Sequence, residues 1–114
     1  MDKEVQYIEW DQITQVVASE RNSKEFTLSV SSGKKKAANN AYGGTFHCKE
    51  RDRLLTEMIH ILHVKAGGQA SLSDRVWLQT DIFNEDKKKG VHFYVHPTML
   101  QIDLKRKVVR KPQE

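Results

Sequence analysis

The chain has 114 residues, of which 30% are charged and 38% hydrophobic, and its formal net charge is +4. This size and balance predict one domain around one core and exclude a disordered chain. Cys48 is the only cysteine, which excludes an internal disulfide and a multi-cysteine metal site and favours a reducing, cytoplasmic location. No signal-peptide pattern opens the sequence and no apolar run is long enough to cross a bilayer, so we expect any membrane contact to be peripheral.

Four short strands are predicted in the first half of the chain. The clearest alternation lies in residues 24–30, where Phe26, Leu28 and Val30 fall on one face. Residues 31–44 are rich in Ser, Gly, Lys and Asn without an apolar period, and they are predicted to form a loop. The remaining strand patterns cover residues 5–10, 12–19 and 45–49.

An amphipathic helix is predicted over about residues 50–65. Its apolar side chains recur at steps of three and four, which is the period of one helix face. Gly67 and Gly68 follow and predict its end. The apolar positions are Leu54, Leu55, Met58, Ile59, Ile61 and Leu62.

Three further strands are predicted after a polar linker, at residues 76–83, 91–95 and 99–104, with a lysine-rich turn at 84–90. Residues 105–114 form a basic tail with few apolar side chains. The whole chain is therefore predicted to be a single domain, in which residues 1–66 supply four strands and the helix and residues 75–104 supply three strands.

The stretch from Val5 to Leu62 resembles the second half of the pleckstrin-homology (PH) and phosphotyrosine-binding (PTB) superfold, in which seven strands precede one capping helix. It is most similar to the PH-like N-terminal region of the large endosomal J-domain proteins of receptor-mediated endocytosis, and it is also similar to the third lobe of FERM domains. The matching segments are residues 25–30, the lysines at 34–36 and residues 54–57.

Residues 76–104 resemble the first three strands of the same superfold, although they follow the helix in this chain. The resemblance therefore implies an α+β domain with a seven-stranded antiparallel barrel or sandwich and one capping helix, in a circularly permuted order. Two alternatives are a strand exchange between two chains, which would make a homodimer, and a chain that spans the end of one repeat and the start of the next.

Three basic clusters would lie at one open end of such a PH-like fold, in the loops between its strands one and two, three and four, and six and seven. In lipid-binding relatives these loops surround an inositol phosphate. The resemblance thus implies a phosphoinositide-binding or other acidic-phospholipid-binding end on a cytoplasmic adaptor of membrane trafficking, peripheral on the endosomal membrane. The candidate ligand-binding residues are Lys34, Lys35, Lys36, Lys87, Lys88, Lys89, Lys105, Arg106, Lys107, Arg110 and Lys111.

Two alternatives to lipid binding are open. PTB and FERM relatives add a peptide strand in the groove beside the helix, and here residues 12–19 would form that edge, which implies a pure protein–protein interaction module. The third alternative is a nucleic-acid-associated PH-like domain, which the strands disfavour because they lack an aromatic pair placed as in RNA-recognition platforms.

No catalytic site, cofactor or metal site is predicted. His92 and His96 are four residues apart on a strand, about 13 Å, which is too far to share a metal ion. Cys48 and His47 are adjacent in a strand and point to opposite faces, so they cannot act as a nucleophile and its base. Cys48 is instead expected to be a small buried hydrophobic residue.

Overall fold

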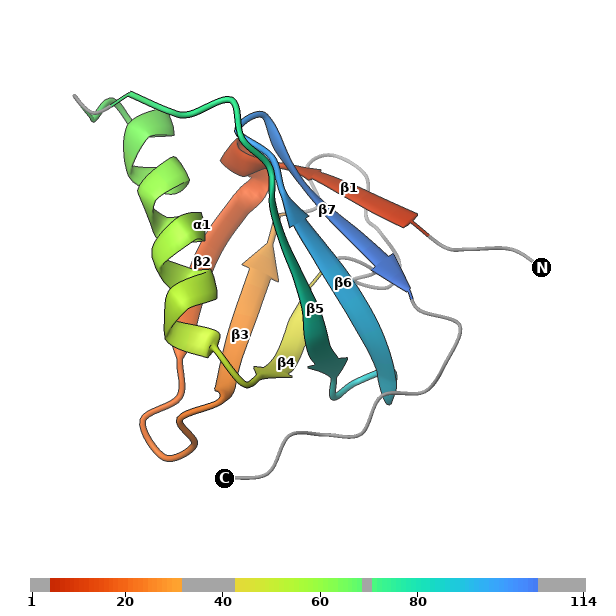
Figure 1. Ribbon diagram of the computed structural model, residues 1–114. Coiled ribbons are helices and arrows are strands. Elements are labelled where there is room, and N and C mark those ends of the chain that lie inside the picture. The colour runs from red at the N-terminus through yellow and green to blue at the C-terminus, as the bar shows by residue number, and fades with distance from the viewer. Residues whose placement is uncertain (1–4, 32–42, 69–70, 105–114) are drawn as a thin grey trace.

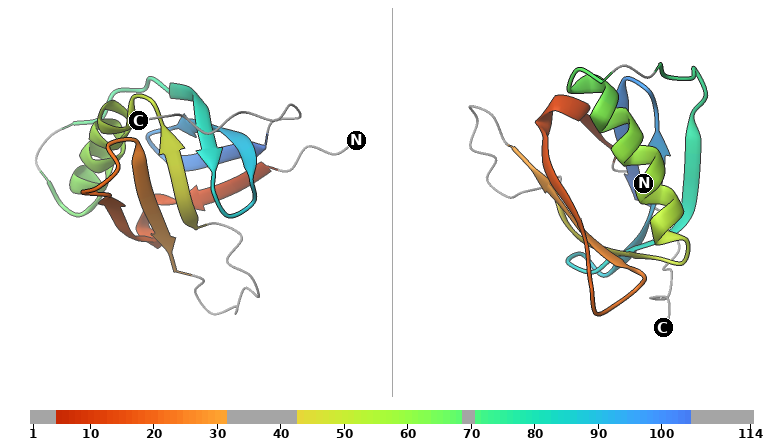
Figure 2. Two further views of the ribbon diagram at one scale, coloured as in Figure 1. Left: turned by 90° about the horizontal axis from the view of Figure 1, so that it is seen from below. Right: turned by 90° about the vertical axis from the view of Figure 1, so that its left-hand side faces the viewer.

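In the part of the chain that the structure describes, seven antiparallel strands form one curled sheet, a half-barrel, with one helix across its open side (Figures 1 and 2). The computed structural model describes residues 5–31, 43–68 and 71–104. The strand order in the sheet is β1-β7-β6-β5-β4-β3-β2. The elements are β1 (Val5–Glu9), the short 3-10 helix η1 (Trp10–Gln12), β2 (Ile13–Ala18), β3 (Glu25–Val30), β4 (Gly44–Cys48), α1 (Arg51–Lys65), β5 (Trp77–Asn84), β6 (Lys89–Val95) and β7 (Met99–Leu104).

The predicted seven strands and one helix are confirmed, with small differences at their ends. The first strand stops at Glu9 because the Glu9 N–H donates to the Gln12 side chain at 2.9 Å, which closes the 3-10 turn. The predicted turn at 84–90 is shorter than expected, since Asn84 and Lys89 face each other as the last pair of β5 and β6. The turn between them contains only residues 85–88.

The late strands complete the sheet that the early strands begin. β5 pairs with β4, and β7 pairs with β1 through five residue pairs from Val5↔Asp103 to Glu9↔Met99. One chain therefore supplies all seven strands. The sheet remains open between β1 and β2, which are its two edge strands.

The core lies between the concave face of the sheet and α1. Phe26, Phe46 and Phe93 form a cluster with ring centroids 5.2–6.1 Å apart, and each is at most 1% exposed. The helix buries one face against this cluster, as its apolar period predicted. In the part of the chain that the structure describes, this 15-residue helix is too short and too polar to span a membrane.

Two side chains hold the open side of the half-barrel in place. Trp10, at the corner between the two edge strands, is 2% exposed, and its indole N–H donates to the His96 carbonyl at 2.9 Å. Arg51, in the first turn of α1, is 9% exposed, and its Nη1 donates to three backbone carbonyls at 2.9–3.1 Å. These carbonyls belong to Ser19, Asn22 and Glu25 in the β2–β3 hairpin.

Candidate functional site

A groove of about 440 Å³ runs between the edge strand β2 and α1. This volume lies in the range of small-molecule and peptide side-chain pockets. The helix runs antiparallel to β2, since its start is hydrogen-bonded to the β2–β3 hairpin and its end lies near η1. The groove is lined by Trp10, Asp11, Ile13, Thr14, Gln15, Val16, Ile59, Leu62, Lys65 and Ala66.

The open edge of β2 presents backbone groups beside this groove that no described residue bonds. Ser19 N–H donates to the Glu25 carbonyl at 3.0 Å, and these two residues continue the β2–β3 register. Because hydrogen-bonded pairs alternate with non-bonded pairs in an antiparallel ladder, the N–H and C=O groups of Val16 and Ala18 point away from β3, towards the open edge. An extended peptide beside β2 could therefore form hydrogen bonds with these donors and acceptors, which recur every second residue as in a β-ladder.

The helix side of the groove offers apolar surface. Ile59 is 49% exposed, and Leu62 and Val16 are half-buried beside it. Exposed isoleucine on a helix that otherwise faces a core provides a surface against which an apolar peptide side chain can pack. Asp11 and Lys65 add one charge of each sign to the lining.

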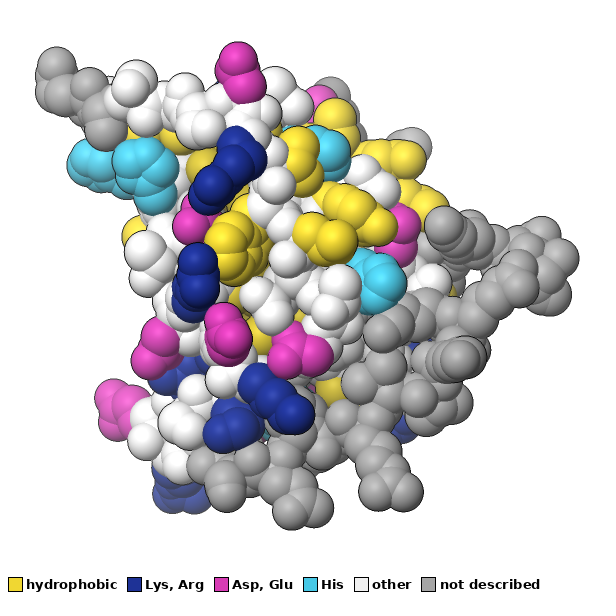
Figure 3. Space-filling model, in the orientation of Figure 1, with side chains coloured by type: hydrophobic (Ala, Val, Ile, Leu, Met, Phe, Trp, Pro, Cys, Tyr) yellow, Lys and Arg dark blue, Asp and Glu magenta, His cyan; other side chains and the backbone are white. Residues whose placement is uncertain are grey.

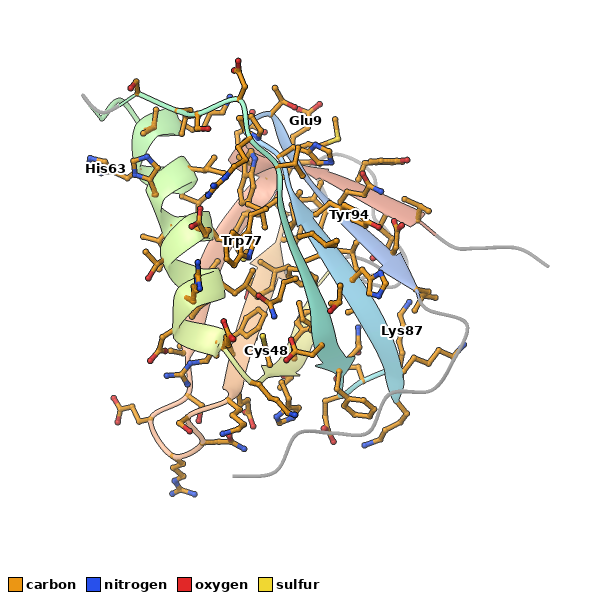
Figure 4. The ribbon with its side chains drawn as sticks, viewed as in Figure 1. Glu9, Cys48, His63, Trp77, Lys87 and Tyr94 are labelled. Carbon is orange, nitrogen blue, oxygen red and sulfur yellow. The ribbon has the colours of Figure 1, made fainter. Side chains whose placement is uncertain are left out.

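The lysine-rich end of the molecule is only partly described. Lys87, Lys88 and Lys89 are exposed at the β5–β6 turn, where Figure 4 shows Lys87 at the start of β6. Lys88 forms an ion pair with Glu85 at 2.7 Å. The other predicted lipid-binding residues, which are Lys34, Lys35, Lys36, Lys105, Arg106, Lys107, Arg110 and Lys111, lie outside the described residues.

The strands that flank these basic segments do end on the same side of the sheet. The β5–β6 turn touches the start of β4, since the Thr45 N–H donates to the Asp86 carboxylate at 2.9 Å and the Glu85 N–H donates to the Thr45 carbonyl at 2.8 Å. The last residue of β7, Leu104, pairs with Val91 near the same turn. The left view of Figure 2 shows the end of β3, the start of β4 and this turn close together.

Within the described residues this end has no built phosphate site. One small space between Gln6, Lys87 and Leu104 measures about 10 Å³, which is the lower limit for a single water molecule. The acids of the turn, Glu85 and Asp86, also reduce its positive charge. The described part of this end can therefore attract an anionic surface but does not enclose a head group.

Cys48 is a buried thiol, as the sequence predicted. It is fully buried, and its Sγ lies 3.7 Å from the Asp81 carboxylate (Figure 4). Burial, with a smaller contribution from the negative charge of Asp81, raises the pKa of Cys48 to about 12. This thiol is the opposite of an activated nucleophile, because almost none of it is thiolate near neutral pH.

We expect the free energy of unfolding to fall between pH 8 and pH 10.5 partly because of Cys48. The unfolded thiol loses its proton near pH 9 while the folded thiol keeps it, so the folded state binds more protons in this window and its stability declines as pH rises. Urea unfolding at both pH values should show a smaller decline in Cys48→Ala than in the wild type. An equal decline in both proteins would contradict the prediction.

The histidines form no metal site among the described residues, which contain no group of three or more potential His, Cys, Asp or Glu ligands. His47 is 1% exposed and its Nε2 lies 3.0 Å from the Glu85 carboxylate, so it serves to fix the β5–β6 turn against β4. His92 lies on the outer face of β6 and His96 directly follows the end of that strand, and their rings lie on either side of Tyr94.

Two features of the β2–β3 hairpin and its edge could not be predicted from the sequence. Arg51 stood among charged residues at a helix start and had the pattern of a surface residue, whereas it is buried against the hairpin. The outward direction of the Val16 and Ala18 backbone depends on the β2–β3 register, which the single sequence does not specify.

A scan against protein-family models and searches of curated proteins and of solved structures each found no match.

Proposed function

We propose that this domain is a non-catalytic, PH/PTB-like interaction module that holds an extended peptide between β2 and α1. The observation that carries this proposal is the coincidence of an open strand edge, formed by the outward backbone groups of Val16 and Ala18, with an apolar groove of about 440 Å³. Strand addition supplies affinity through main-chain hydrogen bonds, while side-chain pockets supply selectivity.

The order of strands supports the PH-like assignment. If the strands are read from β5, each pairs with the next in the order β5, β6, β7 and β1, as expected for a permuted domain. Strands β2, β3 and β4 also pair consecutively, and β4 leads into α1. This is the arrangement that the resemblance implied for seven strands and a capping helix with residues 75–104 moved behind it.

A phage-displayed library of short random peptides tests the proposal. We expect the selected peptides to bind the wild type and to lose at least about tenfold in affinity for Ala18→Pro, because proline removes one outward N–H without touching the β3 ladder. Ala18→Val, which keeps the N–H, is the matched control.

A second pair of variants tests the helix side. Ile59→Glu should weaken binding of the same peptides, whereas Val17→Glu should not, since Val17 is 45% exposed against 49% for Ile59 but does not line the groove. Selected peptides that bind Ala18→Pro and Ile59→Glu as well as they bind the wild type would refute the groove as the site.

A second candidate function is weak attraction to acidic phospholipid, and it is favoured by the described strand ends that border the three basic segments, because these ends lie on one side of the sheet. Each cation near an anionic membrane contributes about 1 kcal/mol, screened by salt. The small space at Lys87 argues for attraction without head-group selectivity. This reading retains the cytoplasmic, trafficking-adaptor role that the resemblance implied.

Sedimentation with vesicles tests the lipid reading. Vesicles that contain phosphatidylserine or phosphoinositide should bind more protein than neutral vesicles, and the double variant Lys87→Glu/Lys89→Glu should bind several-fold less. The control Lys24→Glu/Lys49→Glu makes the same charge change at the opposite ends of β3 and β4, where the Cys48 N–H donates to the Lys24 carbonyl. An equal loss of vesicle binding in both double variants would indicate a response to net charge alone and would refute Lys87 and Lys89 as part of a lipid-binding site.

A further inference from the structure

The second open edge of the sheet, β1, lies apart from the groove. In Figure 1, β1 runs along the side of the sheet away from α1. Natural proteins usually protect an exposed edge strand with lysine, proline or a bulge. The five residues of β1 contain none of these, and their central residue, Tyr7, is the most exposed large hydrophobic side chain among the described residues, at 59%.

The direction of the β1 backbone groups follows from the neighbouring strands. His96 N–H donates to the Met99 carbonyl at 3.0 Å, which makes these residues a bonded pair in the β6–β7 register. Because bonded and non-bonded pairs alternate along the ladder, the N–H and C=O groups of Leu100 point towards β1, where Leu100 is paired with Ile8. The N–H and C=O groups of Val5, Tyr7 and Glu9 therefore point to the open edge.

The hydrogen bonds of Glu9 agree with this alternation. Its N–H does not bond to β7 but is used by the Gln12 side chain at 2.9 Å. Val5 and Tyr7 remain, and no described residue supplies a partner for their four outward groups. The edge thus offers two donors and two acceptors, two residues apart.

From this pattern we infer that β1 pairs with β1 of a second copy, antiparallel and about a two-fold axis at Gln6. In this register Val5 faces Tyr7 of the other copy, and Tyr7 faces its Val5. All four outward groups of each chain are then used, and the Glu9 N–H is not required. A two-fold contact needs a self-complementary surface, and this spacing of donors and acceptors has that property.

The side chains suit the same register. Val5 and Tyr7 both lie on the outer face, so each pair joins an aromatic and a β-branched residue, which is a favourable cross-strand combination. By strand pairing, Tyr7 ends a row that crosses the outer face through Gln101 and Tyr94 to Leu78. Figure 4 labels Tyr94, and Figure 3 shows hydrophobic side chains on this face of the sheet. The two Glu9 carboxylates would lie at opposite ends of the contact, so no like charges face each other.

The other edge strand does not suit a second copy equally well. α1 stands beside β2 and leaves a groove of about 440 Å³, which suits a single extended segment rather than a folded domain. The pairing at β1 is independent of the peptide groove, so either proposal can fail without the other.

Sedimentation equilibrium of the full chain tests the pairing. We expect the mass to rise with concentration from 13.2 kDa towards twice that value. Tyr7→Pro, which removes an outward N–H, and Tyr7→Lys, which charges the edge, should each weaken dimerisation at least about tenfold. Tyr7→Phe and Ala18→Pro should dimerise like the wild type.

Disulfide trapping tests the register. Gln6 would face Gln6 of the second copy as a non-bonded pair with Cα atoms about 4.5 Å apart, which permits a disulfide. Oxidised Gln6→Cys should give a covalent dimer, whereas Leu78→Cys should not. The inference would be overturned by a wild type that stays monomeric at all concentrations, by a dimer that Ala18→Pro disrupts and Tyr7→Pro does not, or by cross-linking of Tyr7→Cys instead of Gln6→Cys.

Discussion

Replacement of Trp10 by alanine is expected to lower the free energy of unfolding by about 4 kcal/mol. Trp10 is 2% exposed, and it packs in the core cluster at the corner where the two edge strands separate. Alanine would leave a large cavity there and would also free the His96 carbonyl, which accepts the indole N–H at 2.9 Å. Thermal unfolding should show a melting temperature roughly 15 °C lower.

Trp10→Phe separates the two contributions. Phenylalanine keeps most of the apolar volume but cannot donate to His96, so a loss of about 1–2 kcal/mol is expected. Because Trp10 also lines the groove, peptides selected on the wild type should bind Trp10→Phe more weakly. A Trp10→Ala protein that melts within a few degrees of the wild type would show that this corner does not stabilise the half-barrel.

Arg51→Ala is expected to cost about 3 kcal/mol, because it removes the buried cationic donor that three carbonyls of the β2–β3 hairpin share. The Asn22 and Glu25 carbonyls also accept a backbone N–H, so the Ser19 carbonyl is the one left without a donor among those described. The guanidinium also bonds to the Asp52 carboxylate through Nε and Nη2 at 2.8–2.9 Å. Urea unfolding monitored by tryptophan fluorescence would measure the change.

Two further variants test the mechanism at Arg51. Arg51→Lys should recover only part of the loss, since an ammonium does not reproduce the planar fork of donors. Asp52→Asn should change stability by less than about 0.5 kcal/mol, because Asp52 is 83% exposed and solvent screens its charge. If Asp52→Asn costs as much as Arg51→Ala, the carboxylate and not the carbonyls would be the important partner.

The element types could be predicted from local pattern, because burial of one face imposes a period on the sequence. The helix at 51–65 and the strand at 99–104 agree with their apolar spacing to within one residue. The ends of the strands were less predictable where a side-chain hydrogen bond determines where the strand stops. The Gln12 amide ends β1 by binding the Glu9 N–H, and no hydrophobic period reports such a bond.

The binding surfaces were predicted in unequal measure. Residues 12–19 were expected to be an edge strand beside the helix, and β2 is an edge strand there. The outward groups of Val16 and Ala18 were not predictable, because they depend on a register that a one-residue bulge between Ile13 and Gln15 shifts. For the basic residues, the resemblance implied a shared end, and this stays a prediction because most of these side chains lie outside the described residues.

The pairing of β1 with β7 has a consequence for synthesis on the ribosome. β1 contains the earliest described residues, yet the β7 residues that pair with it are translated 90 to 98 residues later, from Glu9↔Met99 to Val5↔Asp103. Until then the nascent chain exposes Ile8 and Trp10 without the strand that covers them, together with an unpaired backbone on both sides of β1. A nascent chain stalled before Met99 should therefore need a chaperone to remain free of aggregation, and release of β7 should end that requirement.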